Sequence, residues 1–202
     1  MIYNQEFYES ELKRALLSPR KLAKVVLTPE NDKDAYMRIR EIGSNIESFV
    51  NNGNNLMIWS RGTGTGKTLL ATKLAQKYIA RRNSNTLATD CAVFISVGDL
   101  LTHKHNSWNH DLYSQERILE LEEKIRNCKL VVWDDIGTRG MSYYDQEYLI
   151  VLLNHRLNDL HKSNIYTSNL DSEQLYEVVG ARLFSRLRED TEIIELKGGD
   201  KR

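Results

Sequence analysis

The sequence has few cysteines and prolines and no net charge, and each shortage excludes a class of protein. Its 202 residues include two Cys and two Pro, and 28 Lys plus Arg balance 28 Asp plus Glu. Two cysteines are too few for a disulfide framework, or for a four-ligand zinc site without histidine. A neutral chain has no long-range attraction for nucleic acid, so any contact with DNA requires a local basic patch.

Long apolar runs are also missing. The longest, 92–97 and 130–133, are only a few residues long, whereas a membrane-spanning helix needs ~20. The polar, acidic start MIYNQEFYESELKR is unlike a signal peptide. We therefore expect a cytoplasmic protein in a reducing compartment, with no membrane partner.

The length allows one full domain with a short appendage, and the first thirty residues differ from the rest. We expect an N-terminal helical extension at 1–30 and the main domain at 31–202. Apolar residues recur at helical spacing ahead of Pro19, at Tyr8, Leu12, Ala15 and Leu16. The extension is also basic, through Lys13, Arg14, Arg20, Lys21 and Lys24. Such a stretch is either a solvated face or a surface that docks a partner or nucleic acid.

The main domain begins with a helical pattern over 35–50 and then alternates short apolar runs with longer periodic segments. This alternation is typical of a parallel sheet covered by helices on both faces, an α/β fold. Strands are expected at 56–60, 92–97, 130–133, 164–168 and 192–196. Helices are expected at 67–81, 112–127, 143–161, and as a pair at 172–179 and 181–188. The polar residues 83–89 are expected to form a surface loop.

The segment RGTGTGKT, residues 61–68, has the composition of a phosphate-binding loop. Its glycines allow backbone N–H groups to converge on phosphate oxygens at the positive end of the next helix. Lys67 can reach the β- and γ-phosphates of ATP, and the Thr68 hydroxyl suits Mg²⁺. The predicted nucleotide-binding residues are Gly62, Thr63, Gly64, Thr65, Gly66, Lys67 and Thr68. The strict motif has Gly where this chain has Arg61, which puts the loop's first turn in question because glycine tolerates positive φ.

Two other strand ends carry polar side chains. Asp134 and Asp135 follow the strand at 130–133, on the edge of the sheet where α/β folds bind ligands. We expect Asp134 to be the carboxylate associated with Mg²⁺ and Asp135 to act as general base on the attacking water. Asn169 follows the strand at 164–168 and is predicted to orient water against the γ-phosphate; the alternative is a turn or N-cap residue.

With these three elements in order, the chain resembles the AAA+ ATPases, and within them the bacterial and phage helicase loaders of the DnaC and DnaI type, close to IstB-like ATPases. The resemblance covers roughly residues 30–190 through NLMIWSRGTGTGKTLLATKLA, LVVWDDIGTRG and IYTSNLDSEQLYEVVGARLFSRLRED. It implies a P-loop three-layer sandwich with a parallel five-stranded sheet of order 5-1-4-3-2. Because the chain ends soon after Leu196, no C-terminal lid domain is expected.

The resemblance also implies a function. Such proteins use ATP and Mg²⁺ to place a hexameric replicative helicase on single-stranded DNA, and they self-associate through the ATP site. The segment ARLFSRL resembles the family's box VII, which makes Arg186 the expected arginine finger and Arg182 a second candidate. The alternative is a surface helix with two arginines. Many relatives have Glu at the position of Asp135, and the shorter side chain suggests slow hydrolysis or a water relay.

Residues 98–113, GDLLTHKHNSWNHDLY, interrupt the alternation. They resemble the place of an inserted helical element that faces the central channel in loaders and initiators. Lys104 and Trp108 are the predicted DNA contacts, because a cation meets phosphates and an aromatic face stacks on a base. His103 and His105 could add to these contacts. A plain polar loop is the alternative, and a metal site through these histidines and His110 lacks a carboxylate or cysteine cluster.

Three functions are compatible with these features. A helicase loader or related replication ATPase accounts for all of them. A transposition helper ATPase of the IstB type shares the same core motifs and differs in its partner, a transposase. A small P-loop kinase would leave Asn169 and the ARLFSRL segment without a purpose.

Overall fold

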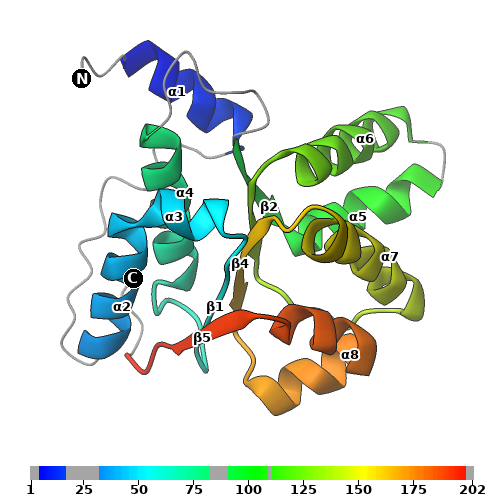
Figure 1. The fold of residues 1–202 in the computed structure, drawn as a ribbon. Helices are drawn as coiled ribbons and strands as arrows, with labels where there is room; N and C mark the ends of the chain where they lie inside the picture. Colours follow the sequence, from blue (N-terminus) through cyan, green and yellow to red (C-terminus); the bar gives the residue numbers. More distant parts are fainter. Residues whose placement is uncertain (1–4, 17–31, 82–90, 109–110, 199–202) are drawn as a thin grey trace.

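The computed structural model describes residues 5–16, 32–81, 91–108 and 111–198. A parallel five-stranded sheet lies between two layers of helices (Figure 1). The strand order is β2-β3-β4-β1-β5, which confirms the predicted order 5-1-4-3-2. Each strand lies within one residue of its expected bounds: β1 (Asn55–Trp59), β2 (Ala92–Ser96), β3 (Leu130–Asp134), β4 (Ser163–Ser168) and β5 (Thr191–Glu195).

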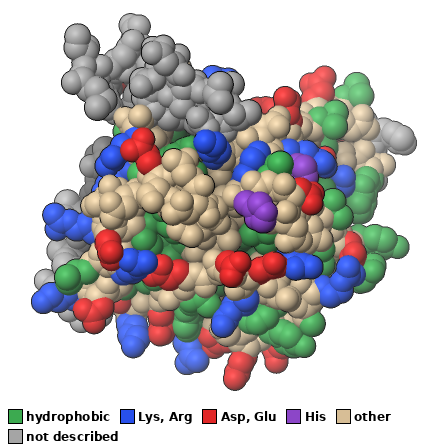
Figure 2. Space-filling view, in the orientation of Figure 1, with side chains coloured by type: hydrophobic (Ala, Val, Ile, Leu, Met, Phe, Trp, Pro, Cys, Tyr) green, Lys and Arg blue, Asp and Glu red, His purple; other side chains and the backbone are tan. Residues whose placement is uncertain are grey.

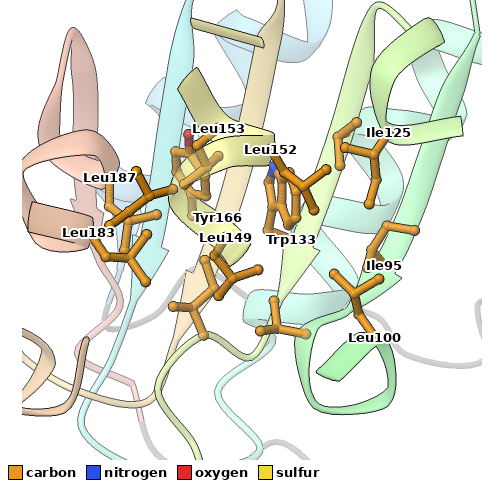
Figure 3. Close-up of a cluster of buried hydrophobic side chains, with 14 of the residues drawn as sticks. Ile95, Leu100, Ile125, Trp133, Leu149, Leu152, Leu153, Tyr166, Leu183 and Leu187 are labelled. Carbon is orange, nitrogen blue, oxygen red and sulfur yellow. The ribbon is translucent and has the colours of Figure 1, made fainter. Parts of the chain in front are cut away.

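Alternating strand residues build two separate cores, one on each face of the sheet. Leu56 and Ile58 pack with α1 (Gln5–Arg14), α2 (Lys33–Ser44), α3 (Ile46–Asn51) and α4 (Lys67–Ala80). Val131 and Trp133 pack on the opposite face with α5 (Val97–Trp108), α6 (Leu112–Asn127), α7 (Tyr143–Asn154) and α8 (Ser172–Arg188). Figure 3 shows the second core, where leucines of α7 and α8 cover Trp133 and Tyr166. Burial on both faces explains why these strands read as continuous apolar runs.

Helix α5 corrects one alternative for residues 98–113. A plain polar loop is wrong, because α5 begins directly after β2 and runs to Trp108. Val97, Leu100 and Leu101 are buried at helical spacing, i, i+3 and i+4. The flanking histidines and other polar residues mask this short apolar face in the sequence.

Two other helices differ in detail from the expected ranges. The pattern over 35–50 divides into α2 and α3 at Asn45, and α7 continues as a π-helical turn, η2 (His155–Asp159). Helix α8 contains one non-helical residue, Gly180, at φ 75° and ψ 161°, so the predicted pair of helices is confirmed. The positive φ favours glycine at this position, and a Cβ atom there would lie 2.7 Å from Gln146 Oε1 of α7, so the Gln146 side chain would have to move.

Helix α1 packs onto the main domain. Leu12 and the following Ala15 are buried in the α1–α4 core, and the Phe94 N–H of edge strand β2 donates a hydrogen bond to Ala15 O at 2.9 Å. The polar segment 83–89 and the basic residues Arg20, Lys21 and Lys24 lie outside the described residues. None of the described helices is long and apolar enough to cross a membrane.

A buried guanidinium closes the amino-terminal end of the sheet. Arg156 of η2 is fully buried and donates hydrogen bonds to five oxygens: Asn164 Oδ1, Ile125 O, Cys128 O, Lys129 O and Ser163 O. Burial lowers the pKa of Arg156 to about 9, which still leaves it charged at neutral pH. This side chain ties the end of α6 to the starts of β3 and β4.

The two cysteines lie at the same end and form a disulfide, Cys91–Cys128. Cys91 directly precedes β2, Cys128 follows α6, and Leu130 N–H donates to Cys91 O at 3.1 Å. Pairing of β2 with β3 therefore brings the two Cα atoms within 4.7 Å. Disulfides are uncommon in a reducing compartment, which is the compartment that the sequence led us to expect.

Reduction of this disulfide is expected to lower the free energy of unfolding by about 2–4 kcal/mol, because the bond constrains a long loop in the unfolded chain. Urea denaturation with and without dithiothreitol measures the difference. A Cys91→Ser/Cys128→Ser variant should match the reduced protein and ignore the reductant. Two titratable thiols in denatured protein purified without reductant would contradict the prediction.

Candidate functional site

The phosphate-binding loop joins β1 to α4 at the carboxyl end of the sheet. Gly62, Gly64 and Gly66 adopt φ values of 112°, 75° and 99°, and Gly66 is the N-cap of α4. These angles explain the glycines, since other residues rarely adopt them. Arg61 is not among the non-glycine residues with positive φ. The left-handed part of the loop thus begins one residue later, and Arg61 is accommodated without strain.

Lys67 folds back across the loop. Its ammonium donates to Ser60 Oγ at 2.6 Å, to Gly62 O at 2.8 Å and to Thr65 Oγ1 at 3.2 Å, and the residue is only 6% exposed. The positive charge is thus held among the loop's own oxygens, beside the N-terminus of α4. A cation beside a helix N-terminus is an arrangement that favours anions.

Asp134 lies at the end of β3 next to this loop. Its Oδ1 accepts hydrogen bonds from Thr68 Oγ1 at 2.8 Å and from Thr167 Oγ1 at 2.7 Å. Burial raises the pKa of the Asp134 carboxyl above its usual range, and the two hydroxyl hydrogen bonds oppose that shift. A hydroxyl and a carboxylate in contact are the oxygen donors that Mg²⁺ prefers in nucleotide sites, so these residues fit the ion.

Asp135 contacts the end of the neighbouring strand. It has φ 64°, its N–H donates to Thr167 Oγ1 at 2.9 Å, and its Oδ1 accepts a hydrogen bond from Asn169 Nδ2 at 2.6 Å. Asn169 is not the N-cap of α8, since Asp171 fills that role through a capping box with Gln174. The N-cap alternative for Asn169 is therefore wrong.

The ends of β1, β3 and β4 thus bring together five predicted side chains: Lys67, Thr68, Asp134, Asp135 and Asn169. Thr167 was not predicted as a site residue, because in the sequence it reads as an ordinary residue of β4. Nor was an ion pair predicted between Arg61 Nη2 and Asp171 Oδ2, which lie 3.1 Å apart. No short-range signal could have found that pair.

The two finger candidates on α8 pair with glutamates of their own chain. Arg186 Nη1 lies 2.6 Å from Glu189 Oε2, and Arg182 pairs with Glu147 of α7. Arg186 also lines an open surface cavity of about 1060 Å³ along α8, together with Tyr176, Phe184 and Arg188, among other residues. The arrangement leaves Arg186 on an outer surface with a glutamate as partner.

The predicted DNA contacts differ in how freely they are presented. Trp108 is 56% exposed, and its ring is stacked with His105 at a centroid distance of 5.3 Å. Lys104 Nζ instead lies 3.6 Å from Glu122 Oε1 and above the ring of Tyr148. The charge of Lys104 is therefore partly offset within the chain.

The histidines nearby make separate contacts. His105 Nε2 lies 2.7 Å from Asp145 Oδ1, and His103 Nδ1 lies 3.3 Å from Ser114 Oγ. Within the part of the chain that the structure describes, which leaves out His110, no group of three or more potential metal ligands occurs. On the face shown in Figure 2, basic and acidic side chains are interspersed.

Comparison with protein families places this geometry in a known class. A family model described as "IstB-like ATP binding protein" matches residues 18–202. The chain belongs to this family. No functionally curated protein matches the sequence. The chain is thus an IstB-like ATP-binding protein with a P-loop α/β fold.

Solved structures share the fold at low identity. The DnaC helicase loader is 21% identical with a TM-score of 0.67, over 89% of this chain and 100% of that chain. DnaI is 23% identical with a TM-score of 0.66, over 89% and 95%. Domain III of DnaA from Thermotoga maritima is 19% identical with a TM-score of 0.67, over 91% and 69%. A DnaA bound to AMPPCP and single-stranded DNA is also similar, at 19% identity and TM-score 0.65, but this chain spans only 53% of it.

Proposed function

We propose that this IstB-like protein binds and hydrolyses ATP with Mg²⁺, and that it uses ATP to load or remodel a replicative ring helicase on single-stranded DNA. The observation that carries the proposal is the convergence of Lys67, Thr68 and Asp134 at one end of the sheet, with Asp135 and Asn169 beside them. The similarity to structures of DnaC and DnaI supports the choice of process.

Each side chain has a distinct part in hydrolysis. Lys67 leaves its loop oxygens to bind the β- and γ-phosphates, while Thr68 and Asp134 would hold Mg²⁺, which when bound neutralises charge on the phosphates. Asp135 accepts a proton from the attacking water. Asn169, which donates to Asp135 Oδ1, orients that water through the same amide.

Self-association completes the site. Arg186 leaves Glu189 and contacts the γ-phosphate of ATP bound to a neighbouring copy. There it stabilises the charge that develops during phosphoryl transfer. Its place in an open cavity on α8 supports this role, as does its match to the box VII segment.

Arg186→Ala is expected to abolish ATP-dependent self-association and to lower kcat about 10³-fold, the usual contribution of an arginine finger. Light scattering and phosphate release measure the two effects. Arg117→Ala, which removes an arginine paired with Glu120 on α6, is the matched control. If only Arg182→Ala loses self-association and activity, Arg182 is the arginine finger. If neither variant loses them, assembly through this helix is contradicted.

The DNA contact is proposed at the end of α5, with Trp108 as the stacking residue and Lys104 as the phosphate contact. Because Glu122 and Tyr148 engage Lys104, we expect Trp108 to contribute more. Trp108→Ala should weaken binding of single-stranded DNA about 5- to 150-fold, from a stacking energy of about 1–3 kcal/mol.

Fluorescence anisotropy with an oligothymidylate measures this change. Leu119→Ala provides the control, because Leu119 is a similarly exposed apolar side chain on the adjacent helix α6. Equal affinities for wild type and Trp108→Ala would remove the stacking role.

A transposition helper ATPase is the second candidate, because the matching family itself is IstB-like. The two candidates share their ATP chemistry and differ in the partner. Co-purification with candidate hexameric helicases and with a transposase, each with and without ATP, decides between them. We expect retention of the helicase that depends on ATP and is lost in Lys67→Ala. A phosphorylated small-molecule acceptor would instead indicate a kinase.

A further inference from the structure

One residue of β4 holds three consecutive residues at the end of β3. The Thr167 hydroxyl donates to Asp134 Oδ1 at 2.7 Å and accepts the Asp135 N–H at 2.9 Å, while its carbonyl accepts the Ile136 N–H at 2.9 Å. The residue is 1% exposed and lies opposite Ile58 of β1 in the register. Thr167 therefore connects the loop-bearing strand β1 to both aspartates.

The hydrogen-bond directions follow from the chemistry of the groups. A hydroxyl has one proton, and the Asp135 N–H can only donate, so the Thr167 proton points to Asp134. Thr68 donates to the same oxygen, Oδ1. Among the described residues, no hydrogen bond reaches Asp134 Oδ2. Two hydroxyls thus fix the carboxylate through one oxygen and leave the other available as a ligand.

The same hydroxyl stabilises an unusual backbone. Asp135 has φ 64°, a conformation that costs a non-glycine residue free energy and persists where neighbouring groups enforce it. The hydrogen bond from its N–H to Thr167 is one such constraint. In this conformation the Asp135 carboxylate meets Asn169.

We propose that Thr167 is a positioning residue of the ATP site: its hydroxyl orients Asp134 so that Oδ2 is available to Mg²⁺, and it holds Asp135 in the left-handed conformation beside Asn169. The inference rests on the proposed ATPase function. Hydrogen bonds from a neighbouring residue to a metal ligand set the orientation of that ligand, and their loss costs about 10- to 100-fold in metal affinity or activity.

Three variants test the role of the hydroxyl. Thr167→Val removes it with little change of volume, and Thr167→Ser retains it. Ser163→Ala is the matched control, because Ser163 is a buried residue at the other end of β4 whose hydroxyl donates to Phe49 O and Val50 O. Thr167→Ala replaces the Val variant if the latter does not fold.

The first measurement needs no nucleotide. Amide hydrogen exchange by NMR should be faster at Asp135 in Thr167→Val than in wild type, and unchanged there in Thr167→Ser and Ser163→Ala.

The second measurement is a Mg²⁺ titration of ATP hydrolysis and of fluorescent ATP binding. Thr167→Val should need about 10- to 100-fold more Mg²⁺ for half-maximal hydrolysis, with a lower kcat and unchanged affinity for ATP in EDTA.

The outcomes separate this inference from the function on which it rests. A Thr167→Val protein with wild-type Asp135 exchange and a wild-type Mg²⁺ requirement overturns the role of Thr167 and leaves the ATPase intact. The role of Thr167 is also overturned if Thr167→Ser changes Asp135 exchange and the Mg²⁺ requirement as much as Thr167→Val does, because the hydroxyl would then not be the cause. Wild-type protein that does not bind ATP overturns the proposed function and this inference together.

Discussion

The position of β4 between β1 and β3 is the constraint on which the candidate site depends. β1 leads into the phosphate-binding loop and β3 ends in the two aspartates. The carboxyl ends of parallel strands meet at one edge of a sheet, so Thr167 and Asn169 of the intervening segment can reach both aspartates. The order of strands, rather than their sequence separation, assembles groups that lie about a hundred residues apart.

The two ends of the sheet hold their charged side chains in different ways. At the carboxyl end, the carboxylates of Asp134 and Asp135 lie near the Lys67 ammonium group. At the amino end, the Arg156 guanidinium is enclosed by five oxygens, four of them backbone carbonyls. Asn164 bridges this cage to Trp133 and Asn55. Arg156 thus connects the residues just before β3 to the first residue of β4.

Much of the fold could be predicted from the sequence because strongly apolar strands and a glycine-rich loop are local signals. All five strands were predicted correctly from these signals, and so was the break at Gly180, whereas the strand order was implied by the resemblance to AAA+ ATPases. Helix α5 was expected only through the family resemblance, since just three of its residues are buried.

The site was predictable where a motif specifies the residue, as for Lys67, Thr68 and Asp134. It was not predictable where the contact depends on tertiary structure alone. Thr167 reads as an ordinary strand residue, and the engagement of Lys104 by Glu122 and Tyr148 requires α5, α6 and α7 to be packed together. The bond between Cys91 and Cys128 likewise follows from strand pairing, which the cysteine count does not reveal.

The ion pair between Arg61 and Asp171 connects the phosphate-binding loop to the N-cap of α8, the helix that carries Arg182 and Arg186. Arg61 is 77% exposed, so water and dissolved ions compete for it and the contact is weak. This ion pair therefore couples the loop to α8 only weakly, and the attraction decreases further as ionic strength rises.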